Sequence, residues 1–135
     1  MAKSIAQSVV FNATPSEIFD MLMNSRKHAK FTGAPARLST KPGAEFSAHG
    51  SYITGRNIEI IPDTRIVQTW RGSDWPEGAH SIVTYSLTPA AGGKTKLTFT
   101  QHGIPDEHVK SISSGWREYY WEPMKAMLKE SSKSK

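Results

Sequence analysis

The sequence contains no cysteine, which excludes disulfide bonds, thiolate nucleophiles and zinc sites built on thiolates. It also contains no run of about 18 apolar residues, so we expect no membrane-spanning helix. The first residues, Met1 to Ser4, lead directly into a strand-like pattern and lack the apolar stretch of a signal peptide. A cytoplasmic location is the simplest expectation for such a chain.

Strong charge of one sign is also lacking, since 17 basic against 12 acidic residues leave a net charge of +5. The densest basic cluster, called the basic group below, consists of Arg26, Lys27 and Lys30. A nucleic-acid interface needs a continuous basic face, preferably with stacking aromatic residues, and the scattered charges here do not form one. We therefore expect no nucleic-acid partner. We interpret the basic group as a solvated helix end and residues 131–135 as a disordered basic tail.

The composition suits one globular domain over residues 1–130. The 135 residues include 37% hydrophobic and 10% aromatic side chains, enough for a real core. Loosely alternating apolar positions predict a first strand over residues 4–11. Thr14, Pro15 and Glu17 form a capping-box pattern with proline at the first helical position, which predicts a helix. A second short helix is expected from residue 25 to about residue 31.

The middle of the chain is predicted to be a β region. Strand-like patterns separated by turns occupy five stretches, residues 45–52, 58–61, 66–71, 82–87 and 96–101. The last two are expected to form a hairpin. Short turns between neighbouring strands favour an antiparallel, meandering sheet.

The last part of the chain is predicted to be one long helix. Asp106 is a suitable cap, and apolar residues follow at three-and-four spacing as far as Met127. Pro123 lies inside this pattern and should kink the helix near Tyr119, because it removes one backbone hydrogen bond. We therefore expect an α+β helix-grip fold, in which a curved antiparallel sheet wraps around the C-terminal helix after two short helices. A cavity is expected where helix and sheet do not meet.

Catalytic and metal-binding motifs are missing. The sequence has no nucleophile elbow, no HExxH motif and no phosphate-binding glycine loop. No two histidines lie at metal-binding spacing on one helix face. We therefore expect no metal, cofactor or catalytic residue. A cyclase or hydrolase would need a buried carboxylate or histidine that the sequence does not reveal.

The large aromatic residues are more informative. Their ordinary role is core packing, but as a group they suit equally well the lining of an apolar ligand cavity. Trp75, in a turn, and Trp121, off the helix stripe, suit exposed anchors for a protein partner. The candidate cavity residues are Trp70, Tyr85, Phe99, Trp116, Tyr119, Tyr120 and Met124.

Five segments resemble one known family and occur in the same order. They are residues 31–36 (FTGAPA), 69–71 (TWR), 73–78 (SDWPEG), 103–105 (GIP) and 115–121 (GWREYYW). The family is the C-terminal domain of the activators of the ninety-kilodalton heat-shock chaperone ATPase, the AHSA family. The resemblance covers nearly the whole chain and implies a START-like helix-grip fold of the SRPBCC superfamily.

The resemblance also implies a function: a non-enzymatic, stress-associated binding domain whose partner is the ninety-kilodalton heat-shock chaperone. In the family this domain contacts the chaperone's N-terminal domains, whereas a preceding domain, which we expect to be absent here, binds the middle segment. The alternative is a carrier or sensor of a small hydrophobic ligand, a role found in the wider superfamily. The expected partner surface consists of Arg26, Lys27, Lys30, Trp75, Pro76 and Glu77.

Overall fold

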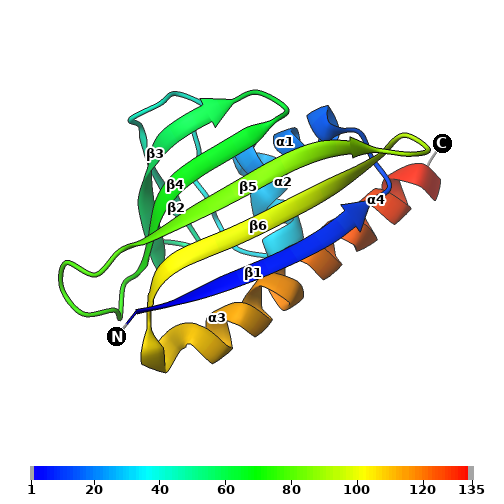
Figure 1. Cartoon of the computed structure of the whole chain (residues 1–135). Coiled ribbons are helices and arrows are strands. Elements are labelled where there is room, and N and C mark those ends of the chain that lie inside the picture. Colours follow the sequence, from blue (N-terminus) through cyan, green and yellow to red (C-terminus); the bar gives the residue numbers. More distant parts are fainter. Residues whose placement is uncertain (1, 134–135) are drawn as a thin grey trace.

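The computed structural model describes residues 2–133 and confirms the predicted α+β helix-grip fold. Within these residues, six antiparallel strands form one sheet in the order β1-β6-β5-β4-β3-β2. In Figure 1 the helices α1 and α2 lie behind the strands, and α3 and α4 run along the sheet beside β1. The elements are β1 (Ala2–Phe11), α1 (Pro15–Met23), α2 (Ser25–Thr32), β2 (Glu45–Ala48), β3 (Ile53–Ile61), β4 (Arg65–Gly72), β5 (Ser81–Ala90), β6 (Lys94–Pro105), α3 (Val109–Trp116) and α4 (Glu122–Lys133).

Helix α1 begins as the sequence predicts. The Thr14 hydroxyl accepts a hydrogen bond from the Glu17 backbone N–H at 3.2 Å, and the Glu17 carboxylate accepts one from the Thr14 N–H at 3.1 Å. Pro15 occupies the first helical position, where its missing N–H costs nothing. The helix buries a face that includes Ile18 and Leu22, and this face packs toward the sheet.

The predicted strand over residues 45–52 is wrong in its second half. β2 ends at Ala48, because His49 (φ 53°) and Gly50 (φ 72°) adopt the left-handed conformation and turn the chain. β3 then begins at Ile53, which pairs with Ala48. The turn between β2 and β3 therefore carries His49 and Tyr52 out of the sheet's regular alternation.

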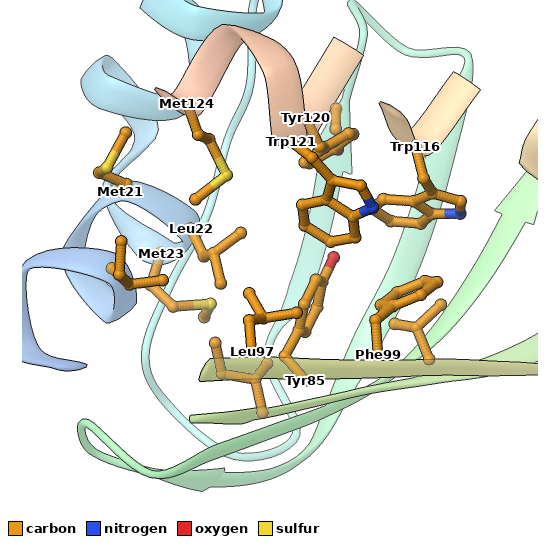
Figure 2. Close-up of a cluster of buried hydrophobic side chains, with 14 of the residues drawn as sticks. Met21, Leu22, Met23, Tyr85, Leu97, Phe99, Trp116, Tyr120, Trp121 and Met124 are labelled. Atoms are coloured by element: carbon orange, nitrogen blue, oxygen red, sulfur yellow. The ribbon is translucent and has the colours of Figure 1, made fainter. Parts of the chain in front are cut away.

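The core fills the space between the sheet and the helices. Strands β5 and β6 form the predicted hairpin, in which Tyr85 pairs with Phe99. Both side chains point toward the helices (Figure 2) and are almost completely buried. Figure 2 shows the cluster where α1, the hairpin and the C-terminal helices meet: Met21, Leu22, Met23, Tyr85, Leu97, Phe99, Trp116, Tyr120, Trp121 and Met124.

The predicted long C-terminal helix is interrupted by a π-helical turn, Arg117–Trp121, between α3 and α4. A 3₁₀ turn, Asp106–His108, precedes α3. Pro123 has no backbone N–H and follows the π-helical turn closely, so the wider hydrogen bonding occurs where the sequence predicts a kink. The predicted tail over 131–135 overlaps α4 at residues 131–133, and residues 134–135 lie outside the described residues. Within residues 2–133, none of the helices has both the length and the apolar character that a membrane crossing requires.

Two hydrogen-bonded glutamines fasten the C-terminal helices to the sheet. The Trp116 indole N–H donates to the buried Gln101 side chain at 2.8 Å, and the Gln101 amide donates to the Ser81 hydroxyl at 2.9 Å. The Trp121 indole N–H donates to Gln7 on β1 at 2.6 Å. Trp121 is only 4% exposed, so its prediction as an exposed anchor is wrong: its ring is held in the core by this bond.

Candidate functional site

The structure contains an apolar cleft of about 370 Å³, called the aromatic cleft below. It lies between α3, the π-helical turn, the β2–β3 turn and the adjoining ends of β3 and β4. It is partly open to solvent. Its lining consists of His49, Tyr52, Ile53, Trp70, Ser111, Ile112, Gly115, Trp116, Tyr119 and Tyr120.

Two tryptophans form the deepest part of the lining. Trp70 on β4 is 6% exposed and Trp116 on α3 is 2% exposed, and their rings lie 5.6 Å apart. Trp116 also packs on Phe99 at 4.3 Å and on Tyr120 at 4.4 Å between ring centroids. Because these rings belong to the continuous core, the floor of the cleft is rigid, whereas its rim includes the half-exposed Tyr119.

A pair of histidines connects the cleft to α2. His49 lines the cleft, and its ring lies 6.2 Å from the buried ring of His28. His49 Nε2 and the Tyr120 hydroxyl are 3.3 Å apart, within hydrogen-bond reach. Burial lowers the pKa of His49, and burial together with the neighbouring His49 lowers the pKa of His28 to about 4. Both imidazoles are therefore neutral at pH 7.

The loop over residues 73–78 contacts two residues of the cleft lining, Tyr52 and Trp70. The Tyr52 hydroxyl, at the rim, donates to the Asp74 carboxylate at 2.7 Å. Burial and this carboxylate raise the pKa of Tyr52 to about 12. Gly72 leaves the space that this packing needs, since a Cβ there would lie 2.9 Å from the Tyr52 hydroxyl and 2.8 Å from the Trp75 indole nitrogen.

The prediction that Trp75 is an exposed anchor is wrong. It is only 3% exposed, and its ring packs on Trp70 at 5.7 Å and on His108 at 5.9 Å. The turn that carries Trp75 folds back over the sheet, because Gly72 has no side chain to exclude the indole. Trp75 therefore anchors its own loop to the wall of the cleft rather than a partner to the surface.

The rest of that loop is exposed and held in one conformation. Arg71 donates to the carbonyl oxygens of Pro76 at 2.6 Å, Ala79 at 2.9 Å and Trp75 at 2.9 Å. The side chains of Pro76 and Glu77 are exposed, as the expected partner surface requires.

The basic group is exposed on α2, whereas His28 of the same helix is buried. Lys27 forms an ion pair with Asp20 of α1. Arg26 and Lys30 extend the positive surface along the helix. The basic group and the loop over 73–78 are two separate exposed segments, and neither contributes a residue to the lining of the aromatic cleft.

The predicted cavity residues divide into two sets. Trp70, Trp116, Tyr119 and Tyr120 line the aromatic cleft. Tyr85, Phe99 and Met124 instead lie in the closed core and do not line it, because the helices cover that part of the sheet. The residues that the prediction missed are His49, Tyr52, Ile53, Ser111, Ile112 and Gly115.

The lining of the cleft is uncharged. None of its lining residues carries a carboxylate, ammonium or guanidinium group. Burial also keeps the Tyr120 hydroxyl protonated, because it raises the pKa of that group well above its usual value. Within residues 2–133, no three histidine or acidic side chains gather as a metal site. The cleft is thus arranged for apolar and hydrogen-bonding contacts.

A meandering antiparallel sheet, a long C-terminal helical segment and an open cleft between them define a domain with the helix-grip fold. The family model described as "Activator of Hsp90 ATPase homolog 1-like protein" matches residues 12–129, and the chain belongs to this family. The match extends from the end of β1 into α4, so it includes the whole lining of the aromatic cleft.

Named relatives agree with the family match. The "Activator of 90 kDa heat shock protein ATPase homolog" of Dictyostelium discoideum is 29% identical over 131 residues, which are 97% of this chain and 34% of that protein. The human "Activator of 90 kDa heat shock protein ATPase homolog 1" is 30% identical over 115 residues, 85% of this chain and 34% of that protein. This chain therefore spans about a third of the length of these curated relatives.

The fold also matches solved structures. A Plasmodium falciparum protein described as an HSP90 activator superposes with a TM-score of 0.86 at 23% identity, and the match covers 93% of this chain and 95% of that one. At this identity the likeness concerns the fold, which it supports over nearly the full length of both chains.

Proposed function

We propose that this chain is a non-enzymatic, co-chaperone-like domain that binds a ninety-kilodalton heat-shock chaperone. The observation that carries the proposal is the family match over residues 12–129, shared with relatives named as activators of that chaperone's ATPase. The proposed contact surface consists of the basic group, the exposed residues Pro76 and Glu77, and the aromatic cleft. Trp75 contributes indirectly, because it fixes the loop from inside.

The physical basis of such binding is divided between the parts of this surface. The cleft offers buried aromatic area, which stabilises a complex once it has formed. The basic group offers positive charge, which mainly raises the association rate toward an acidic partner. The lining of the cleft contains no carboxylate, lysine or arginine, and this favours binding over catalysis.

The test is an amide-resolved NMR titration of the labelled chain with the chaperone from the same organism. We expect line broadening centred on α2 and on residues 73–78. The variant Arg26→Glu with Lys30→Glu should weaken binding, whereas the charge-matched control Lys94→Glu with Lys96→Glu on the β5–β6 hairpin should not. Broadening spread evenly over the molecule, or none at high chaperone concentration, would refute the proposal.

A second candidate function is binding of a small apolar ligand in the aromatic cleft. The specific observation in its favour is a preformed hollow of about 370 Å³ with an apolar lining and a few polar groups, a volume within the usual range of small-molecule sites. A ligand that binds only the folded chain stabilises it by about 2.7 kcal/mol at a hundred times its dissociation constant. Thermal denaturation with a library of apolar compounds tests this function, and a flat response across the library would count against it.

A further inference from the structure

We propose that the aromatic cleft binds an uncharged, flat aromatic molecule that carries a hydroxyl or carbonyl group. This inference rests on the second candidate function above and names its ligand class. It is carried by the shape of the lining, by its lack of charge, and by the position of its polar atoms.

The lining consists largely of aromatic rings. The rings of Trp70, Trp116 and Tyr120 form the inner wall, and those of His49, Tyr52 and Tyr119 surround the opening. Their planes are tilted or edge-on to one another, with centroids 4.4 to 6.1 Å apart where they touch. Such walls present ring faces and edges to a guest, and aromatic guests gain offset-stacked and edge-to-face contacts that a flexible alkyl chain does not.

The lining does not compensate a charge. It contains no acidic or basic side chain that is ionised at pH 7, since burial lowers the pKa of His49. A carboxylate or ammonium group in the cleft would lose its hydration without gaining a counter-ion. The nearest charge shown by a contact is Asp74, which already accepts the Tyr52 hydroxyl proton in a hydrogen bond and would repel an anionic guest.

One polar pair in the lining is placed to bind a ligand's polar group. The Tyr52 hydroxyl donates to Asp74, and the Ser111 hydroxyl donates to the His108 carbonyl at 3.1 Å. The contact between His49 Nε2 and the Tyr120 hydroxyl is 3.3 Å, long for a bond to a hydroxyl group. A hydroxyl group can donate one hydrogen bond and accept another, so the Tyr120 hydroxyl keeps a further bond for a ligand hydroxyl or carbonyl beside its contact with His49.

The experiment compares three probes that differ in one property each. 1-Pyrenemethanol is flat and neutral, 1-pyrenecarboxylate is flat and anionic, and decan-1-ol is neutral and aliphatic. We expect 1-pyrenemethanol to bind at least ten times more tightly than either of the others. Binding is measured by isothermal titration and by energy transfer from tryptophan to pyrene, because Trp70 and Trp116 lie in the wall.

A matched pair of variants locates the site. Gly115 lines the cleft, and a Cβ there would meet only the Tyr119 ring, at 3.8 Å, so Gly115→Leu fills the cleft without a backbone clash. Ser114→Leu adds the same side chain one residue earlier, at an exposed position outside the lining. We expect Gly115→Leu to weaken 1-pyrenemethanol binding at least tenfold and Ser114→Leu to leave it unchanged.

Each outcome decides a separate question. Equal or tighter binding of decan-1-ol overturns the aromatic class but leaves ligand binding intact, and equal binding of 1-pyrenecarboxylate overturns the uncharged class. Binding of none of the probes overturns both this inference and the second candidate function, without bearing on the chaperone. Should Gly115→Leu fail to fold, NMR contacts between pyrene protons and the rings of Trp116 and Tyr119 in the unaltered chain decide the location, and their absence refutes it.

Discussion

His28 lies where α2, the β2–β3 turn and the π-helical turn meet. Its ring packs on Phe31 at 5.1 Å, on Tyr120 at 5.2 Å and on His49 at 6.2 Å, and its Nδ1 is buried without a hydrogen-bond partner. Burial, together with the neighbouring His49, destabilises the charged imidazolium relative to the neutral imidazole. The pKa of His28 therefore lies at about 4 in the folded chain.

This burial makes stability depend on pH in mildly acidic solution. The unfolded chain protonates His28 near pH 6.5, whereas the folded chain does so only near pH 4. The stabilisation is therefore complete above pH 6.5 and is lost as the pH falls toward 4, by up to about 1.4 kcal/mol per pH unit. Urea denaturation of His28→Phe at several pH values should show a flatter profile over this window. The exposed control His80→Phe should keep the steep profile, and identical slopes in both variants would contradict the assignment.

At Gly55 the neighbouring backbone and a ring leave no space for a side chain. A Cβ at Gly55 would lie 1.9 Å from the Thr69 carbonyl oxygen and 2.5 Å from the Phe46 ring, so the backbone itself obstructs a side chain. We expect Gly55→Ala to lower the free energy of unfolding by about 1–3 kcal/mol, as overpacking does. Gly115→Ala, which meets nothing closer than 3.8 Å and lies in a helix, should be neutral or stabilising. Chemical denaturation compares the two, and equal effects would contradict the argument.

At the scale of elements, the attachment of the C-terminal helices depends on buried hydrogen bonds as well as on packing. Gln101 on β6 joins Trp116 of α3 to Ser81 of β5, and all three are almost inaccessible to water. Gln7 on β1 performs a similar role for Trp121 but is only half-buried.

This difference in burial predicts unequal effects of the same substitution. Gln101→Leu leaves a buried indole N–H without a partner, which costs about 1–3 kcal/mol of stability. Gln7→Leu should cost less, because water can reach the freed groups. Thermal denaturation monitored at both near-ultraviolet and far-ultraviolet wavelengths measures this, and a larger loss for Gln7→Leu would show that burial does not decide the cost.

The sequence predicted those elements whose signals are local. Thr14 and Glu17 act within one helical turn, so the start of α1 was predictable. Gly50 and Tyr52 continue the alternation of β2, so the turn that ends the strand was not, because it depends on positive φ angles that alternation does not encode.

The aromatic cleft was half predictable for a related reason. Trp116 and Tyr120 lie on the apolar stripe of the C-terminal helices, which periodicity reveals. Whether a residue on the sheet faces a hollow or a closed core depends on how the helices cover it, as the burial of Tyr85 shows. The β2–β3 turn places His49 and Tyr52 at the cleft, and no local sequence pattern predicts this placement.

At the scale of the whole molecule, the net charge of +5 affects the rate of association with a charged partner. If the basic group steers the chaperone, the association rate should fall when salt rises from about 0.05 M to about 0.5 M, as screening shortens the reach of the charges. Stopped-flow measurements should show a weaker salt dependence for Arg26→Glu with Lys30→Glu than for the Lys94→Glu with Lys96→Glu control. Equal salt dependence in the two variants would assign the steering to charges elsewhere.

The order of the strands has a consequence for how the chain acquires its fold in time. Among the strands of residues 2–133, β1 is synthesised first and pairs only with β6, with Ala2 opposite Pro105 and Phe11 opposite Thr95. On a ribosome adding roughly 5–20 residues per second, β1 waits several seconds for its partner to emerge. Its pairing then closes a loop of nearly the whole chain, a step that contact order makes slow. Of these six strands, the one made first is thus among the last to be placed, and the sheet is completed only after β6 has been made.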